Sequence, residues 1–216
     1  MSASIHAARF DAPVLHAQMV FRSALEVLSR PGSIVELPRD ALASLCGLPC
    51  QPATAALLLT LTDPDTPIHL GLGGAANAVL TDWLAFHCGS PVVAEPEEAA
   101  FAVIPLDQLD TETLFACSPG EPDYPDRATT IICEADGLDL VAPETGEAPM
   151  LTGPGIRVAS SLALQPDPSQ FWEAMQRNRA RYPLGPDVIL VSGSRIAGVP
   201  RSTRVHPIDT QMVEAN

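Results

Sequence analysis

The amino-acid sequence predicts a single α/β domain built on a mixed β-sheet. Segments with helical and strand periodicity mix along the 216 residues without strict alternation, which favours a mixed sheet over a purely parallel one. The chain is 46% hydrophobic and 18% charged, as expected of a globular protein rather than a disordered one. Because no linker or internal repeat divides it, we expect one domain over residues 1–216, with an ordered core at about 13–205 and flexible termini.

The N-terminal half is expected to contain four helices and two strands. The first helix runs from Pro13 to Ser29, with Asp11 as its cap and Pro31-Gly32 as its stop. The apolar residues of this helix that share one stripe are Val14, Phe21, Leu25 and Leu28. The other expected elements are strands at 33–37 and 68–72, helices at 39–46, 52–60 and 75–87, and a turn at 63–67.

The C-terminal half is expected to end in a helix and a β-hairpin. The helix spans 168–182 and turns Phe171, Trp172 and Met175 inward, and the hairpin pairs 188–191 with 195–199 around Ser192-Gly193-Ser194. The segment 117–127 holds three prolines and is expected as a mobile loop, and the tail after Val205 is expected to fray. The remaining expected elements are strands at 100–104, 129–134 and 149–151, and a helix at 106–116.

The composition excludes several classes of protein. All 12 basic residues are arginine, so no lysine is present to form a Schiff base or to serve in a nucleotide-binding phosphate loop. A GC-rich coding bias is the simplest cause of this absence. The net charge of −14 argues against a nucleic-acid partner, because such proteins need a basic surface.

The sequence favours a bacterial cytoplasmic location. No apolar run approaches the roughly 20 residues of a membrane span, so no membrane association is expected. The N-terminus contains His6, Arg9 and Asp11 and does not have the apolar core of a signal peptide. The five cysteines have no framework spacing and are expected as buried free thiols.

Several local motifs have an ordinary structural explanation. Gly71-x-Gly73-x-x-Ala76, with Glu95 downstream, matches a dinucleotide-binding fingerprint, but turn glycines between a strand and a helix explain it equally. Cys46-x-x-x-Cys50 supplies only two of the four ligands of a structural zinc site, and no metal is expected. The histidines form no metal-binding pair, and no Gly-x-Ser-x-Gly nucleophile elbow occurs.

Two other segments point more directly to anion binding. Leu151-Thr-Gly-Pro-Gly-Ile156 can expose backbone N–H groups to an anion, although it also fits a tight turn. Pro200-Arg-Ser-Thr-Arg204 places two arginines around two hydroxyls, which could grip a phosphate or a partner carboxylate, or could lie in solvent at the end of a strand.

These segments, in their order and spacing from about Phe21 to Val205, resemble the H subunit of the bacterial carbon–phosphorus lyase system, the PhnH family. The matching motifs are Phe21-Arg22 with Leu28-Ser29-x-Pro31-Gly32-x-Ile34; Leu58-Leu-Thr-Leu-Thr-Asp63 with Asp65-Thr-Pro67; Phe86-His87 with Pro91; Ala100-Phe-Ala-Val103; Leu151-Thr-Gly-Pro-Gly-Ile156; Tyr182-Pro-Leu-Gly185 with Asp187-x-Ile-Leu190; and Pro200-Arg-Ser-Thr203.

The resemblance implies a three-layer fold like a reduced pyridoxal-phosphate-dependent transferase of the aspartate aminotransferase type, without the cofactor. It implies a homodimer and a place beside the G, I and J subunits of the lyase complex. With the G, I and L subunits, a member of the family supports formation of a ribose triphosphate phosphonate from ATP and a phosphonate. The resemblance supplies no catalytic residue, and no cofactor is expected.

Three hypotheses about function follow. In the first, the chain is a structural or co-catalytic subunit of a transferase and lyase complex and is not catalytic alone. In the second, it binds a nucleotide or phosphonate anion; the residues that would then converge are Arg22, Thr152, Gly153, Gly155, Arg201 and Thr203. In the third, it is an independent NAD-dependent enzyme that uses Gly71 and Gly73.

Overall fold

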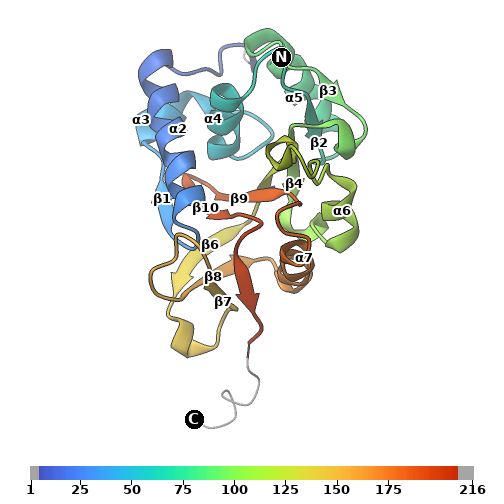
Figure 1. The fold of residues 1–216 in the computed structure, drawn as a ribbon. Coiled ribbons are helices and arrows are strands. Elements are labelled where there is room, and N and C mark those ends of the chain that lie inside the picture. The colour runs from blue at the N-terminus through green and yellow to red at the C-terminus, as the bar shows by residue number, and fades with distance from the viewer. Residues whose placement is uncertain (1–4, 209–216) are drawn as a thin grey trace.

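A computed structural model describes residues 5–208, which fold around two β-sheets (Figure 1). The larger sheet has seven strands in the order β1-β10-β9-β5-β4-β2-β3, and the smaller has four in the order β11-β7-β8-β6. Within this part of the chain, no helix is long and apolar enough to cross a membrane.

The seven-stranded sheet is mixed, as predicted. Its parallel strands are β9 (Asp187–Ser192), β5 (Thr130–Glu134), β4 (Phe101–Pro105), β2 (Ile68–Leu70) and β3 (Val92–Val93). The antiparallel edge consists of β10 (Arg195–Val199) and β1 (Ile34–Glu36). Gly193, with a φ of 62°, allows the tight turn between β9 and β10, so the predicted hairpin is confirmed.

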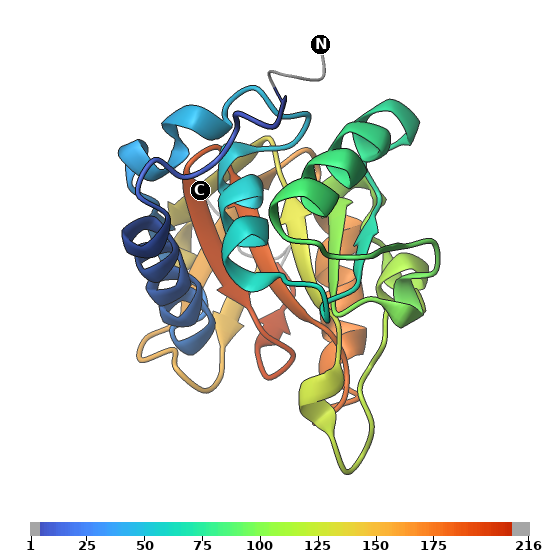
Figure 2. The same ribbon diagram turned by 90° about the horizontal axis from the view of Figure 1, so that it is seen from above.

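Helices cover one face of this sheet, which Figure 2 shows from above. They are α2 (Pro13–Ser29), α3 (Arg39–Leu42), α4 (Pro52–Leu61) and α5 (Gly74–His87). Each of α2 and α4 begins with a proline, whose missing N–H costs nothing in the first turn. Every second residue of a strand faces this layer, so Val103, Ile132 and Ile189 pack against it.

The other face carries α6 (Thr111–Ala116), α7 (Ser169–Arg179) and the smaller sheet. The strands of that sheet are β6 (Gly137–Val141), β7 (Met150–Thr152), β8 (Ser160–Gln165) and β11 (Arg204–His206). Ile131 and Cys133, the neighbours of Ile132, pack on this side, and Phe171, Trp172 and Met175 of α7 point inward as predicted. The molecule therefore has a hydrophobic cluster on each face of a shared central sheet.

Short helical turns connect several of these elements. They are η1 (Ala43–Leu45), η2 (Pro96–Glu98), η3 (Leu106–Gln108), η4 (Pro125–Arg127) and η5 (Pro143–Thr145). The helix predicted at 106–116 is split, because the Asp110 side chain accepts a hydrogen bond from the Thr113 N–H and starts α6 anew.

Three sequence-based expectations are corrected. The smaller sheet was largely missed, since only β7 was predicted, and β11 shows that His206 belongs to a strand rather than to a frayed tail. Asp11 does not cap α2; its carboxylate accepts a hydrogen bond from the Ser44 hydroxyl instead. The predicted flexibility at residues 1–4 and 209–216 lies outside the described residues.

The largest correction concerns α2, whose bounds were predicted correctly. Its buried side is His16, Val20, Ala24 and Val27. Three members of the apolar stripe, Val14, Phe21 and Leu25, lie instead on the solvent-exposed side. The fourth member, Leu28, is partly buried and packs against the core. The predicted stripe is therefore real in its periodicity but faces the core only at its carboxyl-terminal end.

Candidate functional site

The glycine-containing loop after β7 lies beside the Pro200–Thr203 turn, although some 50 residues separate them in sequence. Strand pairing places Thr152 opposite Arg204, and the Thr152 hydroxyl lies 2.8 Å from Nε2 of His206. Gly153 has a φ of 138°, and a Cβ there would stand 3.1 Å from the Ser202 carbonyl oxygen and 3.6 Å from Cα of Thr203. The structure therefore brings Thr152, Gly153 and Thr203 together.

Gly155 serves the packing of this loop against the end of α2. Its φ of 82° belongs to the left-handed region. A Cβ at this position would overlap the carbonyl oxygen of Ser29, and it would lie 2.8 Å from Cδ of Pro31. Close approach of two backbones, rather than exposure of an N–H group, accounts for this glycine.

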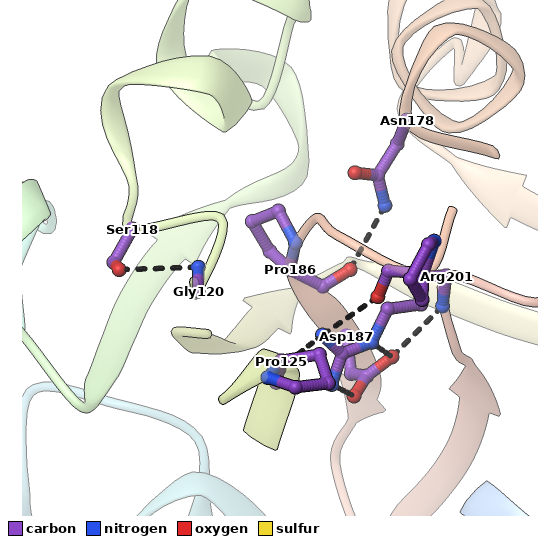
Figure 3. Close-up of polar contacts among 8 residues, drawn as sticks. Ser118, Gly120, Pro125, Asn178, Pro186, Asp187 and Arg201 are labelled. Atoms are coloured by element: carbon purple, nitrogen blue, oxygen red, sulfur yellow. Dashed lines mark hydrogen bonds and ion pairs between the residues drawn. The ribbon is translucent and has the colours of Figure 1, made fainter. Parts of the chain in front are cut away.

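Arg201 forms the centre of a polar cluster at the start of β9 (Figure 3). Its Nε and Nη2 donate to the two carboxylate oxygens of Asp187 at 3.2 and 2.9 Å, and its backbone N–H donates to the same carboxylate at 2.8 Å. Nη1 donates to the carbonyl oxygens of Pro125, at 2.5 Å, and Pro183, at 3.4 Å. The guanidinium therefore ties two loops to one strand.

The ion pair between Arg201 and Asp187 is largely shielded from water. The two side chains are 16% and 23% exposed, and the paired charges neutralise each other. The bidentate arrangement uses the planar fork of arginine, which a lysine could not reproduce. The guanidinium makes four hydrogen bonds, two to the Asp187 carboxylate and one each to the carbonyl oxygens of Pro125 and Pro183. It therefore stabilises the fold rather than pointing into solvent.

Further polar contacts hold the same loops. Nδ2 of the buried Asn178 donates to the Pro186 carbonyl oxygen at 2.8 Å (Figure 3). The Gly185 N–H donates to the Pro119 carbonyl oxygen at 2.8 Å. Within residues 5–208, Oδ1 of Asn178 and the hydroxyl of the buried Thr203 have no hydrogen-bond partner. The Tyr182–Asp187 and Pro200–Thr203 motifs thus converge at the amino-terminal ends of the parallel strands.

Arg22 lies apart from these contacts. It occupies an exposed position of α2 and makes no hydrogen bond or ion pair with any residue between 5 and 208. Of the six residues predicted to bind an anion, three are therefore neighbours, Gly155 packs against α2, and Arg201 is turned toward Asp187. The sequence offered Arg201 as an anion-binding residue and named Asp187 only within a family motif, so it did not predict that the two residues pair.

A second polar cluster, which the sequence did not indicate, lies at the other end of the parallel strands, where their carboxyl termini meet. The Glu134 carboxylate, at the end of β5, accepts hydrogen bonds from the Gln51 N–H at 2.7 Å and the Thr54 hydroxyl at 2.6 Å. It thereby pairs with the N–H of the residue before α4 and with a hydroxyl of the first turn, and it places a negative charge at the positive end of that helix. These contacts account for a carboxylate at the carboxyl-terminal ends of the parallel strands, where ligands typically bind.

The glycines of the dinucleotide-like motif do lie between a strand and a helix. Gly71 follows β2, Gly73 has a φ of 101° and precedes α5, and Glu95 follows the neighbouring parallel strand β3. The side chain of Asn77 occupies this turn, where it accepts from the Leu72 N–H and donates to the Leu70 carbonyl oxygen. A Cβ on Gly71 would stand 3.1 Å from the Val103 carbonyl oxygen, so close packing also requires that glycine.

The cysteines are free, and burial raises the pKa of four of their thiols. Burial and the nearby Glu134 carboxylate raise the pKa of Cys50 to about 12, and burial raises the pKa of Cys117 to about 11. Burial also raises the pKa of Cys88 and of Cys133. Cys46, however, is exposed, and Cys50 and Cys88 are only partly buried, which corrects the expectation that all five thiols are buried. No group of three or more His, Cys, Asp or Glu side chains within the described chain could hold a metal ion.

A cavity of about 400 Å³ opens between β8 and the start of α7. Leu162, Leu164 and Trp172 form its apolar wall, and Glu147, Asp167 and Glu173 are its charged residues. None of its lining residues is an arginine, so it does not suit a phosphate or phosphonate. The predicted anion-binding residues do not line it.

Comparison with known proteins identifies one family. The model of the family described as "Bacterial phosphonate metabolism protein (PhnH)" matches residues 8–206. The chain is 33% identical over 208 residues to the alpha-D-ribose 1-methylphosphonate 5-triphosphate synthase subunit PhnH of Rhizobium meliloti (strain 1021), with 93% of this chain and 96% of that protein covered. It is 28% identical over 193 residues to the putative C-P lyase subunit protein HtxG of Stutzerimonas stutzeri, with 88% and 85% covered. The chain therefore belongs to the PhnH family of bacterial phosphonate metabolism proteins.

Proposed function

We propose that the chain is a subunit of a carbon–phosphorus lyase complex in phosphonate catabolism. Together with the G, I and L subunits, it supports formation of a ribose triphosphate phosphonate from ATP and a phosphonate. Its role is structural or co-catalytic, and it acts in the cytoplasm, where ATP is available. The names of its relatives support this proposal, since one is a synthase subunit and the other a putative C–P lyase subunit.

The observation that carries the structural side of this proposal is the state of Arg201. This residue is the first arginine of the Pro200–Arg204 motif, and its guanidinium is bound by Asp187 and by two backbone carbonyl groups. The motif therefore holds two loops in place. That role suits a subunit whose surface must be rigid for assembly.

Reconstitution of the synthase from purified subunits tests this proposal. The G, I and L subunits are incubated with ATP and methylphosphonate, with and without this chain, and the ribose product is followed by phosphorus NMR. We expect product only when the chain is present with the other subunits. Product from the chain alone would overturn the proposal, and so would an undiminished yield in its absence.

The chain also pairs with itself and with the G, I and J subunits in this proposal. Native mass spectrometry of the chain alone and of the co-expressed subunits measures both associations. We expect a dimer in the first sample and a complex that contains the chain in the second. A monomer in the first would exclude self-pairing without affecting the larger assembly.

Binding of an anion is a second candidate function. Its support is the convergence of Thr152, Gly153 and Thr203, together with the buried Thr203 hydroxyl that has no partner within residues 5–208. Calorimetry with ATP and with methylphosphonate on the wild type and on Arg22→Ala, Thr203→Val and Arg201→Ala tests it. Absence of heat with both ligands on the wild type would exclude this function.

An NAD-dependent enzyme remains the third candidate. The unit of β2, α5 and β3 supports it, because its turn contains Gly71 and Gly73 and Glu95 follows β3. The contacts of Asn77 and the packing of Gly71 already explain the motif without a ligand. No change in melting temperature on addition of NAD would exclude this candidate.

The scaffold itself is proposed to resemble a reduced pyridoxal-phosphate-dependent transferase that has lost its cofactor. A chain without lysine cannot form the internal Schiff base of such enzymes, which supports loss of the cofactor. Borohydride reduction after addition of pyridoxal phosphate, read by mass spectrometry of peptides, should find no modified side chain.

A further inference from the structure

Helix α2 presents an apolar stripe to solvent on the side away from its buried residues. Val14 is 74% exposed, Leu15 55%, Phe21 47% and Leu25 52%. Val14, Phe21 and Leu25 are separated by seven and four residues and therefore lie in one line along the helix. A helix that is apolar on two sides is normally covered on both.

This stripe is too large to be incidental. Four of the large exposed hydrophobic residues of the described chain belong to one 17-residue helix. Single exposed apolar residues are common on protein surfaces, whereas a contiguous group of this size marks an interaction site. Phe21 is the kind of aromatic anchor that contributes much of the binding energy at protein interfaces.

An unpaired positive charge lies beside the stripe. On α2, the exposed Glu26 and Arg30 pair with each other at 3.2 Å, whereas Arg22, next to Phe21, forms no ion pair within the described residues. The loop at 153–159 lies at the carboxyl end of α2 in both views (Figures 1 and 2) and is fixed there by the hydrogen bond from the Ser160 hydroxyl to the Gly32 carbonyl oxygen. This loop also carries two exposed side chains, Arg157 and Val158, the latter 81% exposed. The unpaired Arg22 beside the stripe contrasts with the net charge of −14 of the whole chain.

We infer that the α2 stripe, defined as Val14, Leu15, Phe21 and Leu25, is the docking surface for another subunit of the complex. The matching surface of that subunit is apolar at its centre and carries a carboxylate at its edge, opposite Arg22. This inference rests on the proposed function, because it assigns a surface to the assembly proposed there. It goes further by naming the residues and the chemistry of the contact.

Charge argues for a different subunit rather than for a second copy. If two copies of the chain paired through α2 about a two-fold axis, the two helices would run antiparallel. The stripes would match best with Val14 of one copy facing Leu25 of the other, and Arg22 would then face Ala17. With a rise of 1.5 Å per residue, the two copies of Arg22 would lie about 8 Å apart along the axis, on the same side of the contact. Like charges held on the same side of a contact repel each other, so this surface suits a different partner, and the proposed homodimer would use another surface.

The double substitution Phe21→Asp and Leu25→Asp tests this surface. Both side chains are about half exposed, so we expect the melting temperature of the isolated chain to stay within a few degrees of the wild type. The dissociation constant for binding to the G, I and J subunits should rise by about thirtyfold or more, as expected for loss of residues that contribute most of the binding energy, and the variant should be lost during co-purification. The reverse-charge variant Arg22→Glu should also weaken it, and the loss should depend on salt.

Leu140→Asp is the matched control, because Leu140 is 57% exposed but lies on β6, away from α2. It should assemble like the wild type. Assembly of the double variant at wild-type affinity would overturn the inference, and so would a double variant that loses only a homodimer. If the wild type itself fails to assemble, the proposed function fails instead, so the two failures are distinguishable.

Discussion

At the scale of single residues, Arg201 shows how a residue with the sequence features of a ligand-binding cation can serve the fold. Removing it would leave Asp187 partly buried without its counter-charge and would free the carbonyl groups of Pro125 and Pro183. We expect Arg201→Ala to lower the free energy of unfolding by about 3–5 kcal/mol, measured by urea denaturation. Arg195→Ala breaks a more exposed ion pair with Asp139 and should cost about 1 kcal/mol or less. Equal losses in the two variants would contradict this role.

His87 gives the molecule a dependence on pH. Burial lowers the pKa of this imidazole below its ordinary value of 6.5, so the unfolded chain binds a proton more readily than the folded one. The neutral form of His87 therefore contributes to the stability of the folded protein above pH 6.5, and this contribution is lost as the pH falls through the lowered pKa. We expect the melting temperature of the wild type to fall more steeply between about pH 7 and pH 5 than that of His87→Phe, which keeps the aromatic contacts with Trp83 and Phe86. Parallel curves for the two proteins would exclude this contribution.

At the scale of elements, α6 depends on its cap. The Thr113 N–H donates to the Asp110 carboxylate at 2.8 Å, and this hydrogen bond lowers the pKa of Asp110. Asp110→Ala should cost about 1 kcal/mol of stability at neutral pH, measured by denaturant unfolding. The stabilisation should diminish as the pH falls through the lowered pKa, because a protonated carboxyl accepts more weakly. Asp110→Asn keeps an acceptor without the charge, and so it should retain most of the stability and lose the pH dependence.

At the scale of the whole molecule, the two hydrophobic clusters are expected to unfold together. The central strands contribute alternate residues to both, as Ile131 and Ile132 do, so neither cluster can open without disturbing the other. The two tryptophans report on one cluster each: Trp83 belongs to the cluster under α2, α4 and α5, and Trp172, a residue of α7, belongs to the cluster on the other face of the sheet. In the variants Trp83→Phe and Trp172→Phe, the fluorescence transition should coincide with the loss of circular dichroism in urea. Separate midpoints would show that the two layers unfold independently.

The elements that the sequence predicted well are those whose signal is local. The bounds of α2 follow from Pro13 and Pro31-Gly32, and the β9–β10 hairpin follows from Ser192-Gly193-Ser194, because prolines and glycines restrict the backbone wherever they occur. The smaller sheet was largely missed because its strands are short or partly polar and gain stability only by pairing with distant strands. β6 and β8 illustrate this, since the residues that pair between Gly137–Val141 and Ser161–Gln165 lie 20 to 28 positions apart in the sequence.

By itself, the sequence determined the class of the fold, the bounds of most elements, membership in a family through motifs spread along the chain, and the exclusion of lysine-dependent chemistry. The tertiary structure alone decided which apolar stripe of α2 is buried, since periodicity defines a face but not what covers it. It also decided that Arg201 faces Asp187 and two carbonyl groups. The physical reason is the same in both cases. Burial and hydrogen-bond partners depend on residues far away in the chain, whereas spacing and residue type are properties of the chain itself.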